Sequence, residues 1–186
     1  GAGRGFGRRV AEVLAQQGAA LVVTDLTEEL VGGTVDALAA SGADITGIAG
    51  DISLEETSVG LAEHIRQRHG ALDIAINNAG IAQPQTRLHE TDSALAQKVI
   101  AIDLTAIFFA MKQQIPLMLD RVAQTGSQCS ILNVASAAGQ MGSPMLAVYA
   151  AAKHGVVGIT RSAAVEYGRK GIRVNCYTPG HITTPF

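Results

Sequence analysis

The chain has 186 residues, of which 47% are hydrophobic and 16% charged, with a mean hydropathy of +0.23. This length suits one domain with a substantial core, and the composition excludes a disordered chain. A net charge of −2 and a pI of about 6.2 exclude the basic surface typical of nucleic-acid binding. We therefore expect a single domain over residues 1–186 without a nucleic-acid partner.

The remaining composition gives no sign of a membrane, a disulfide framework or a metal. The most apolar stretch, residues 99–119, contains Asp103 and Lys112, which argues against a membrane span. Cys129 and Cys176 lie in apolar runs and are expected to be reduced core residues. No signal or transit peptide is visible, so a cytoplasmic location is expected. No metal-ligand spacing occurs among the histidines, which are His64, His69, His89, His154 and His181.

Short apolar runs alternate with amphipathic stretches along the chain. Helical spacing from Phe6 to Leu14 predicts a helix that ends near Gly18. A long helical region after a polar loop at 81–90 reaches about residue 119, and Pro116 is expected to bend or end it. The other predicted elements are strands at 20–24, 44–48, 72–76, 130–134 and 172–176, and helices at 28–40, 54–69 and 146–168.

This alternation predicts an α/β fold with a doubly wound parallel sheet covered by helices on both faces. In such sheets, ligands bind beyond the carboxyl ends of the strands. Polar and glycine-rich groups follow the strand ends or the place where a strand should be, at residues 1–7, 25, 51, 77–80, 136 and 179–180. Their common location is a stronger indication of a site than any single motif.

The first of these groups is a glycine-rich loop. Gly1, Gly5 and Gly7 follow the spacing G-x-x-x-G-x-G and lead directly into the first predicted helix. Such a loop lets backbone amides and a helix N-terminus approach a pyrophosphate. An ordinary glycine-rich turn is the alternative. The candidate contacts also include the loop residues Gly3, Arg4 and Phe6.

Asp25 ends the predicted strand twenty residues after Gly5. An acidic side chain there can accept hydrogen bonds from the adenosine ribose and repel a 2′-phosphate. We therefore favour NAD, with Leu26 beside the same ligand. Arg4 could instead pair with the 2′-phosphate of NADP, so NADP stays possible.

The next two strand ends carry further candidates. Asp51, followed by Ile52, suits either the adenine edge or the start of a helix. The sequence Asn77-Asn78-Ala79-Gly80 suits close backbone approach to a ribose, with side chains that fix neighbouring strands. A plain turn is the alternative for this second group.

A possible proton-transfer site lies in the second half of the chain. Tyr149 and Lys153 are one helical turn apart, so they share a helix face. A cation beside the phenol lowers its pKa from about 10 and makes it a usable acid or base. Ser136 lies just past a strand end, thirteen residues before Tyr149. The spacing of Tyr149 and Lys153 alone occurs often by chance. A serine at position 136 alone would more often cap a turn.

Taken together, these motifs resemble the short-chain dehydrogenase/reductase family over essentially the whole chain. The matching residues, in order, are Gly1, Gly5, Gly7, Asp25, Asp51, Asn77, Asn78, Ala79, Gly80, Ser136, Tyr149, Lys153, Ile172, Arg173, Val174, Asn175, Pro179, Gly180, Ile182 and Thr184. The resemblance implies a Rossmann-like domain, three-layer α/β/α, usually assembled as a dimer or tetramer. It also implies hydride exchange between nicotinamide and a small-molecule alcohol or carbonyl compound.

The resemblance further implies a role for each site residue. Tyr149 would be the general acid/base and Ser136 would polarise the substrate oxygen. Lys153 would lower the pKa of Tyr149 and bind the nicotinamide ribose. Cofactor contacts would also come from Asn78, Ala79, Gly80, Pro179, Gly180, Ile182 and Thr184.

The chain departs from the family pattern at several places. Asp103 stands where the family has a catalytic asparagine, and can serve if only the backbone carbonyl at this position holds a relay water. Phe6 replaces a small aliphatic residue. A first strand, central in the sheet, is missing, as are the lid and last strand expected after Phe186, so we expect a fragment of a longer enzyme.

The leading hypothesis is an NAD-dependent dehydrogenase or reductase of secondary alcohols and ketones. The runner-up is an NADP-dependent 3-oxoacyl thioester (acyl carrier protein) reductase, which Arg4 permits and Asp25 opposes. A non-catalytic cofactor-sensing module and a sugar epimerase are weaker alternatives. The substrate is not readable from the sequence, but residues 81–90 and 137–146 are expected to line its pocket.

Overall fold

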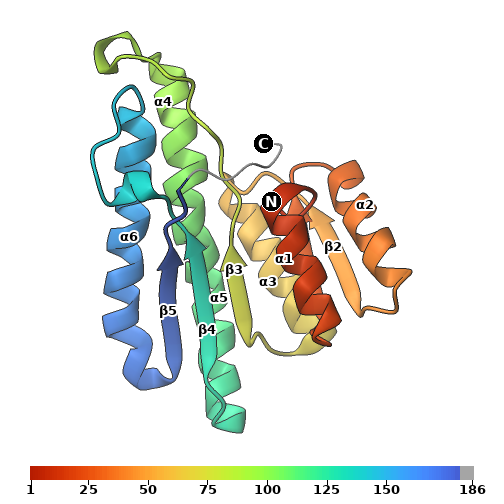
Figure 1. Cartoon of the computed structure of the whole chain (residues 1–186). Coiled ribbons are helices and arrows are strands. Elements are labelled where there is room, and N and C mark those ends of the chain that lie inside the picture. The colour runs from red at the N-terminus through yellow and green to blue at the C-terminus, as the bar shows by residue number, and fades with distance from the viewer. Residues whose placement is uncertain (181–186) are drawn as a thin grey trace.

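The structure, a computed structural model, describes residues 1–180. Five parallel strands alternate with helices along the chain (Figure 1). The elements are α1 (Gly5–Gln16), β1 (Leu21–Asp25), α2 (Glu28–Ala39), β2 (Ile45–Ala49), α3 (Glu55–His69), β3 (Ile74–Asn77), α4 (Ser93–Ile100), α5 (Ala106–Thr125), β4 (Cys129–Val134), α6 (Ala147–Tyr167) and β5 (Ile172–Tyr177). Every predicted helix and strand occurs, with ends shifted by a few residues, and the α/β fold is confirmed.

The long helical region differs from its prediction near Pro116. A proline removes one backbone hydrogen bond, yet α5 continues past it to Thr125. Pro116 is exposed, while Ile115, Leu117 and Met118 beside it are buried, so core packing holds the helix together. The irregularity lies instead at a π-helical turn, Ala101–Thr105, between α4 and α5. The expectation that the helix could end near Pro116 was wrong, and a bend there stays a prediction.

This continuous helix, Ser93–Thr125, is long and apolar enough to cross a membrane by length and composition. In the structure its residues Met111, Ile115 and Met118 join the core that α5 forms with β3, β4, β5 and α6. Packing in that core accounts for the apolar residues on the buried face of the helix, and 28% of its most apolar window is buried.

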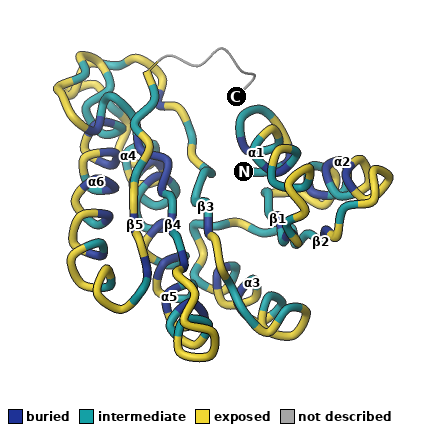
Figure 2. Tube along the Cα trace, turned by 60° about the horizontal axis from the view of Figure 1, so that its bottom comes forward, coloured by how far each residue is buried: buried dark blue, intermediate teal, exposed yellow. Residues whose placement is uncertain are grey.

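Helices cover both faces of the strands. Helices α1 and α2 pack on β1 and β2, whereas α3 packs beside α5, and α5 and α6 pack on β4 and β5. Figure 2 shows α1 and α2 apart from α3, α5 and α6. Two separate core clusters result, one around β1 and β2 and one around β3, β4 and β5.

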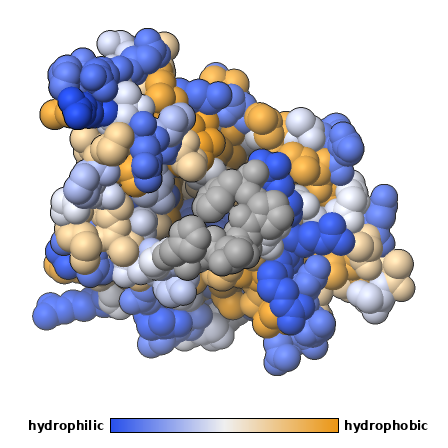
Figure 3. Space-filling model, turned by 45° about the horizontal axis from the view of Figure 1, so that its top comes forward, coloured by the Kyte–Doolittle hydropathy of each residue, from blue (hydrophilic) through white to orange (hydrophobic). Residues whose placement is uncertain are grey.

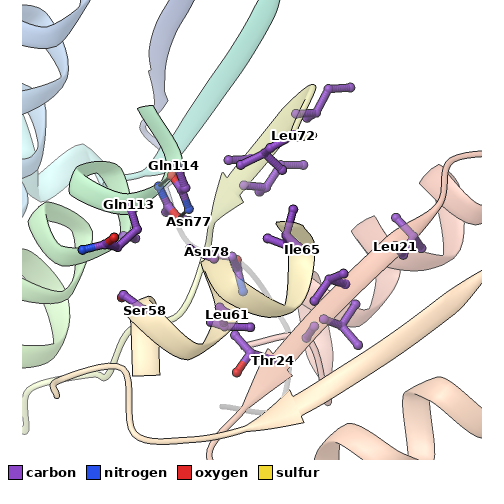
Figure 4. A pocket seen from close by; sticks show the side chains of 18 of the residues that line it. Leu21, Thr24, Ser58, Leu61, Ile65, Leu72, Asn77, Asn78, Gln113 and Gln114 are labelled. Carbon is purple, nitrogen blue, oxygen red and sulfur yellow. Dashed lines mark hydrogen bonds between the residues drawn. The ribbon is translucent and has the colours of Figure 1, made fainter. Parts of the chain in front are cut away.

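The strands form two sheets rather than one. Within residues 1–180, strand β1 pairs only with β2, and β3, β4 and β5 pair in that order. A cavity of about 500 Å³ separates β1 from β3, lined by both strands and by α1, α3 and α5. Its wall is mostly apolar, with polar groups such as Asn77, Asn78 and Gln114 (Figure 4). The free edges of β1 and β3 therefore face each other across a slot.

The N-terminal residues close one end of this slot. The backbone nitrogens of Gly1 and Ala2 donate to the carbonyl oxygen of Thr24, at the end of β1. The Asn78 side chain, just past β3, donates to the carbonyl oxygen of Gly1 at 2.9 Å. The chain start thus joins the carboxyl ends of β1 and β3, where the candidate site residues lie.

Candidate active site

The glycine loop forms an uncapped helix start. Helix α1 begins at Gly5, whose φ of 55° lies in the left-handed region that glycine tolerates. No side chain caps this helix and no acidic residue lies in its first turn. Its first N–H groups therefore lack intrahelical partners and can bind an anion. This geometry is compatible with a pyrophosphate, and the contacts of Gly1, Gly3, Arg4, Gly5, Phe6 and Gly7 with it stay predictions.

Close packing explains why positions 3 and 7 of this loop are glycines. A Cβ atom on Gly7 would overlap the carbonyl oxygen of Gly1, and one on Gly3 would lie 2.7 Å from Leu30 Cβ. The ring of Phe6, the unusual residue in the loop, stacks on Tyr177 at the end of β5 with centroids 6.1 Å apart. The loop thus contacts the far sheet through Phe6.

Asp25 stabilises the glycine loop, a role that the sequence did not predict. Its two carboxylate oxygens accept hydrogen bonds from the amides of Gly3 and Leu26, both at 2.8 Å. Burial works to raise the pKa of Asp25, but these bonds and the positive charge of Arg4 hold it below its ordinary value. Asp25 is therefore ionised and anchors the loop. Its oxygens keep further lone pairs for ribose hydroxyls.

The neighbouring candidates for the adenosine end are more exposed. Leu26 is 63% exposed. Asp51 accepts bonds from the Ser53 hydroxyl and amide, so it forms a turn just before α3, whose N-cap is Leu54. These bonds lower the pKa of Asp51. Of the two predicted roles, the start of a helix fits this geometry, and the contact with adenine stays a prediction, as does that of Ile52.

The Asn77-Asn78-Ala79-Gly80 segment joins neighbouring strands, as predicted. Asn77 Nδ2 donates to Asn133 Oδ1 of β4 at 2.8 Å, and Gln114 of α5 donates to Asn77. Asn78 holds Gly1, as described above. A Cβ on Gly80 would lie 2.9 Å from Asp103 Oδ1 and 3.4 Å from Lys153 Nζ. Gly80 therefore leaves room beside the charged groups.

Ser136, Tyr149 and Lys153 come together at the same edge. Ser136 follows β4 and begins the 3-10 turn Ala137–Gly139, where its Oγ accepts a bond from Ala138. Tyr149 lies in the first turn of α6, close enough to Ser136 for this serine to act on the pKa of its hydroxyl. Lys153, only 3% exposed, donates to the carbonyl oxygen of Val134 at 3.2 Å.

The predicted effect of Lys153 on Tyr149 is not present in this structure. Burial raises the pKa of Tyr149, the Ser136 hydrogen bond lowers it less, and the Asp103 charge raises it further. Lys153 Nζ lies 5.5 Å from the centre of the Tyr149 ring. Burial also lowers the pKa of Lys153, and the pull of Asp103 opposes this. Here the lysine charge interacts with Asp103, so the expectation of a lowered Tyr149 pKa is corrected.

Asp103 lies within this group. It is fully buried in the π-helical turn, and its Oδ1 accepts a bond from the Ile81 amide at 2.8 Å. Its Oδ2 is buried without a hydrogen-bond partner in the described part of the chain. Burial raises the pKa of Asp103, and Lys153 and the Ile81 amide oppose this.

Several predicted residues lie outside the site or the described range. Cys129 is buried and Cys176 half-buried, and both are free thiols. His154 contacts the Ala150 carbonyl on its own helix. No group of three His, Cys, Asp or Glu that could hold a metal occurs within residues 1–180. Pro179 accepts a bond from Ala137, while the predictions for His181, Ile182 and Thr184 fall outside the described residues.

Sequence reasoning missed two supporting residues. Gln83, 5% exposed, accepts a bond from the Tyr149 amide and so caps α6 from the 81–90 loop. A Cβ on Gly139 would lie 2.6 Å from the Lys153 carbonyl oxygen, so this glycine lets the turn after Ser136 approach α6. A buried glutamine within a polar loop has no periodicity that would identify it. The sequence shows a glycine at position 139, three residues after Ser136, but it does not predict that this glycine contacts α6.

The face around this edge mixes polar and apolar side chains (Figure 3). An uncapped helix start after a glycine loop, an acidic residue at the end of β1 and a phenol near a serine hydroxyl are typical of one class, the α/β nicotinamide-dependent oxidoreductases. The sequence model described as "short chain dehydrogenase" matches residues 1–186. The chain belongs to the short-chain dehydrogenase family, as the resemblance indicated.

Named relatives agree with this assignment. The chain is 41% identical over 185 residues to 2,5-dichloro-2,5-cyclohexadiene-1,4-diol dehydrogenase of Sphingobium indicum, covering 100% of the chain and 71% of the relative. It is 38% identical to cyclohexanol dehydrogenase of an Acinetobacter species, covering 100% of the chain and 72% of the relative. The chain spans 66% to 72% of the length of the curated relatives that it matches.

Solved structures share the fold. The crystal structure of levodione reductase superposes with a TM-score of 0.92 at 35% identity, over 99% of this chain and 70% of that one. A 3-ketoacyl-(acyl-carrier-protein) reductase of Brucella melitensis, complexed with NADH, gives 0.93 at 30% identity, over 100% and 74%. These matches confirm the Rossmann-like fold.

Proposed function

We propose that the chain forms the catalytic core of an NAD-dependent dehydrogenase that exchanges a hydride with a secondary alcohol or ketone. The observation that carries this proposal is the meeting of Ser136, Tyr149 and Lys153 at the edge that also holds the glycine loop. A hydroxyl donor, a phenol and a buried ammonium are groups that can together exchange a proton with an alcohol oxygen.

Each residue then has a definite task. When bound, nicotinamide would supply the hydride exchange and, in its oxidised form, a positive charge near the phenol. During oxidation, Ser136 donates a hydrogen bond to the substrate oxygen, and the Tyr149 phenolate takes the hydroxyl proton. During reduction, Tyr149 returns that proton. Lys153 uses one donor on Val134 and keeps two for ribose hydroxyls beside Gly80.

The preference for NAD rests on Asp25. An ionised carboxylate at the end of β1 accepts bonds from both ribose hydroxyls and repels a 2′-phosphate. The exposed Arg4 side chain makes no capping hydrogen bond to α1. Its charge is therefore the feature that would favour the 2′-phosphate of NADP. The solved relative with bound NADH supports NAD.

A ring-bearing substrate is the class we propose. The named relatives are a cyclohexanol dehydrogenase, a cyclohexadienediol dehydrogenase and levodione reductase. Met141 and Met145, near Ser136 in sequence, are 62% and 45% exposed. Thr86 of the 81–90 loop donates to the Met145 carbonyl at 2.9 Å, so the two predicted pocket segments adjoin. Flexible thioethers suit the apolar face of a ring.

A second candidate is a 3-oxoacyl thioester reductase that uses NADP. The similarity to the 3-ketoacyl-(acyl-carrier-protein) reductase favours the thioester substrate, and the exposed Arg4 favours NADP. The ionised Asp25 opposes its use of NADP. The homo-oligomeric state, the cytoplasmic location and the absence of membrane and nucleic-acid partners stay predictions.

The test is the formation of NADH, followed by absorbance, with a panel of cyclohexanols, acyclic secondary alcohols and 3-hydroxyacyl thioesters. We expect the highest kcat/KM with a cyclic alcohol and NAD. Preference for a thioester with NADP would establish the second candidate instead. Absence of turnover with every alcohol and both cofactors would contradict both.

A further inference from the structure

Asp103 is an unusual residue for its surroundings. It is 0% exposed, and the π-helical turn Ala101–Thr105 that carries it interrupts the α4–α5 helix at the site. Such turns occur mostly at functional positions. An ionised carboxylate at this depth is costly unless charges or hydrogen bonds compensate it.

The contacts of Asp103 account for only one of its two oxygens. Oδ1 accepts the bond from the Ile81 amide, which holds the loop after β3. Oδ2 is buried and has no partner within the described residues. Because an amide oxygen would accept the Ile81 bond equally well, the loop contact explains an asparagine as readily as an aspartate. The property that only aspartate adds is charge.

That charge faces the proton-transfer pair. The titratable groups that interact with Asp103 are Lys153 and Tyr149, both on α6, while the loop after β3 contributes the Ile81 amide. Asp103 Oδ1 and Lys153 Nζ both lie within 3.4 Å of the place where a Gly80 Cβ would be. In this buried setting, the interaction between the charges is much stronger than in water.

We propose that the Asp103 carboxylate is a positioning residue that sets the pH range of the site by holding the Lys153 charge and opposing loss of the Tyr149 proton. This inference rests on the proposed function. Its consequence is a site that keeps Tyr149 as a proton donor to higher pH, which favours carbonyl reduction near neutrality and alcohol oxidation in alkaline solution.

The electrostatic directions agree with this role. Asp103 raises the pKa of Tyr149 as a like charge, and it raises the pKa of Lys153 as an opposite charge. Removing the charge must therefore lower both pKa values. The acid limb of the oxidation rate requires the phenolate and the alkaline limb requires the ammonium, so both limbs should move to lower pH.

The experiment compares Asp103→Asn with the unsubstituted protein. Asparagine retains the shape and the Ile81 bond and removes the charge. The pH dependence of kcat/KM for oxidation should move to lower pH on both limbs. The matched control is Asp120→Asn, the same change at an exposed position on α5, which should leave the profile in place. An unmoved Asp103→Asn profile, or an equal movement in the control, would overturn the proposal.

A second readout needs no turnover. Tyrosinate absorbance, measured for each protein and its Tyr149→Phe derivative, gives the titration of Tyr149 by difference. The Asp103→Asn substitution should move that titration to lower pH, and no movement would contradict the inference whatever the activity. If Tyr149→Phe retains full turnover, the proposed function fails, and this titration still decides on Asp103. Should Asp103→Asn not fold, Asp103→Ser removes the same charge and must move the titration in the same direction.

Discussion

At the scale of single residues, the site depends on atoms that are absent as much as on those present. Gly7 can pass the Gly1 carbonyl only because it has no Cβ, and Gly80 leaves space between Asp103 and Lys153. The glycine motif in the sequence marked this loop, although the contact between Gly7 and Gly1 was not predicted. The second contact required the fold, because residues 80, 103 and 153 are far apart in the chain.

The Gly7→Ala substitution tests the packing of the glycine loop. Its methyl group would meet backbone, which cannot rotate away, so we expect a loss of about 1–3 kcal/mol in the free energy of unfolding and weaker NADH binding. Urea denaturation and the fluorescence of bound NADH measure the two effects.

Gly33→Ala is the matched control for this change. Gly33 also lies inside a helix, but nothing lies within 4 Å of its Cβ position, so the substitution should stabilise the protein by about 0.5–1 kcal/mol. Equal effects at positions 7 and 33 would show that helix propensity, rather than close packing, governs Gly7.

The electrostatics of Tyr149 show where residue-level prediction from sequence ends. The i, i+4 spacing correctly predicted that Lys153 shares a helix face with Tyr149. It could not predict that both would be desolvated, or that Asp103, 46 positions before Tyr149, would be the charge that acts on them. Burial is a property of the packed molecule, and here it outweighs the local spacing.

At the scale of elements, hydrophobic periodicity identified each helix and strand because each buries one or both faces. The expectation that Pro116 could end the helix came from the proline itself, and it failed because buried residues on either side hold the helix together. Periodicity did not predict the π-helical turn, because no periodic pattern marks Ala101–Thr105. The pairing between strands was open as well, since periodicity does not specify strand neighbours.

The slot between β1 and β3 leads to a prediction about these elements. Gly1 and Ala2 already bond to the last carbonyl of the free β1 edge, and the slot behind them is apolar and edged by parallel strands. A strand of about six apolar residues placed before Gly1 should pair with both edges. We expect a higher Tm, by roughly 2–4 °C for each kcal/mol gained, and slower amide hydrogen exchange in β1 and β3.

An extension of equal length made of glycine and serine provides the control. It has no side chains to bury in the slot, so it should leave Tm and the exchange of β1 and β3 unchanged. A similar gain from both extensions would mean that the slot does not select an apolar strand.

At the scale of the whole molecule, parallel strands bring distant residues to one edge. Three strands end beside site residues, which are Asp25 at the end of β1, Asn78 after β3 and Ser136 after β4. Gly1 lies at the same edge, and α6 adds Tyr149 and Lys153. This convergence could be predicted from sequence, because the carboxyl ends of parallel strands share an edge. The supporting contacts of Gln83 and Gly139 could not, because they depend on how a loop and a turn pack against α6.

The central claim is that Tyr149 exchanges a proton with an alcohol oxygen, and Tyr149→Phe tests it most directly. The ring is retained and only the hydroxyl is lost. NADH formation from the best cyclic alcohol should fall by about 10²–10⁴-fold, with NADH binding retained. Tyr167→Phe, the same change at the far end of α6, is the control and should leave turnover unchanged. Turnover of the Tyr149→Phe protein equal to that of the unsubstituted protein would contradict the account.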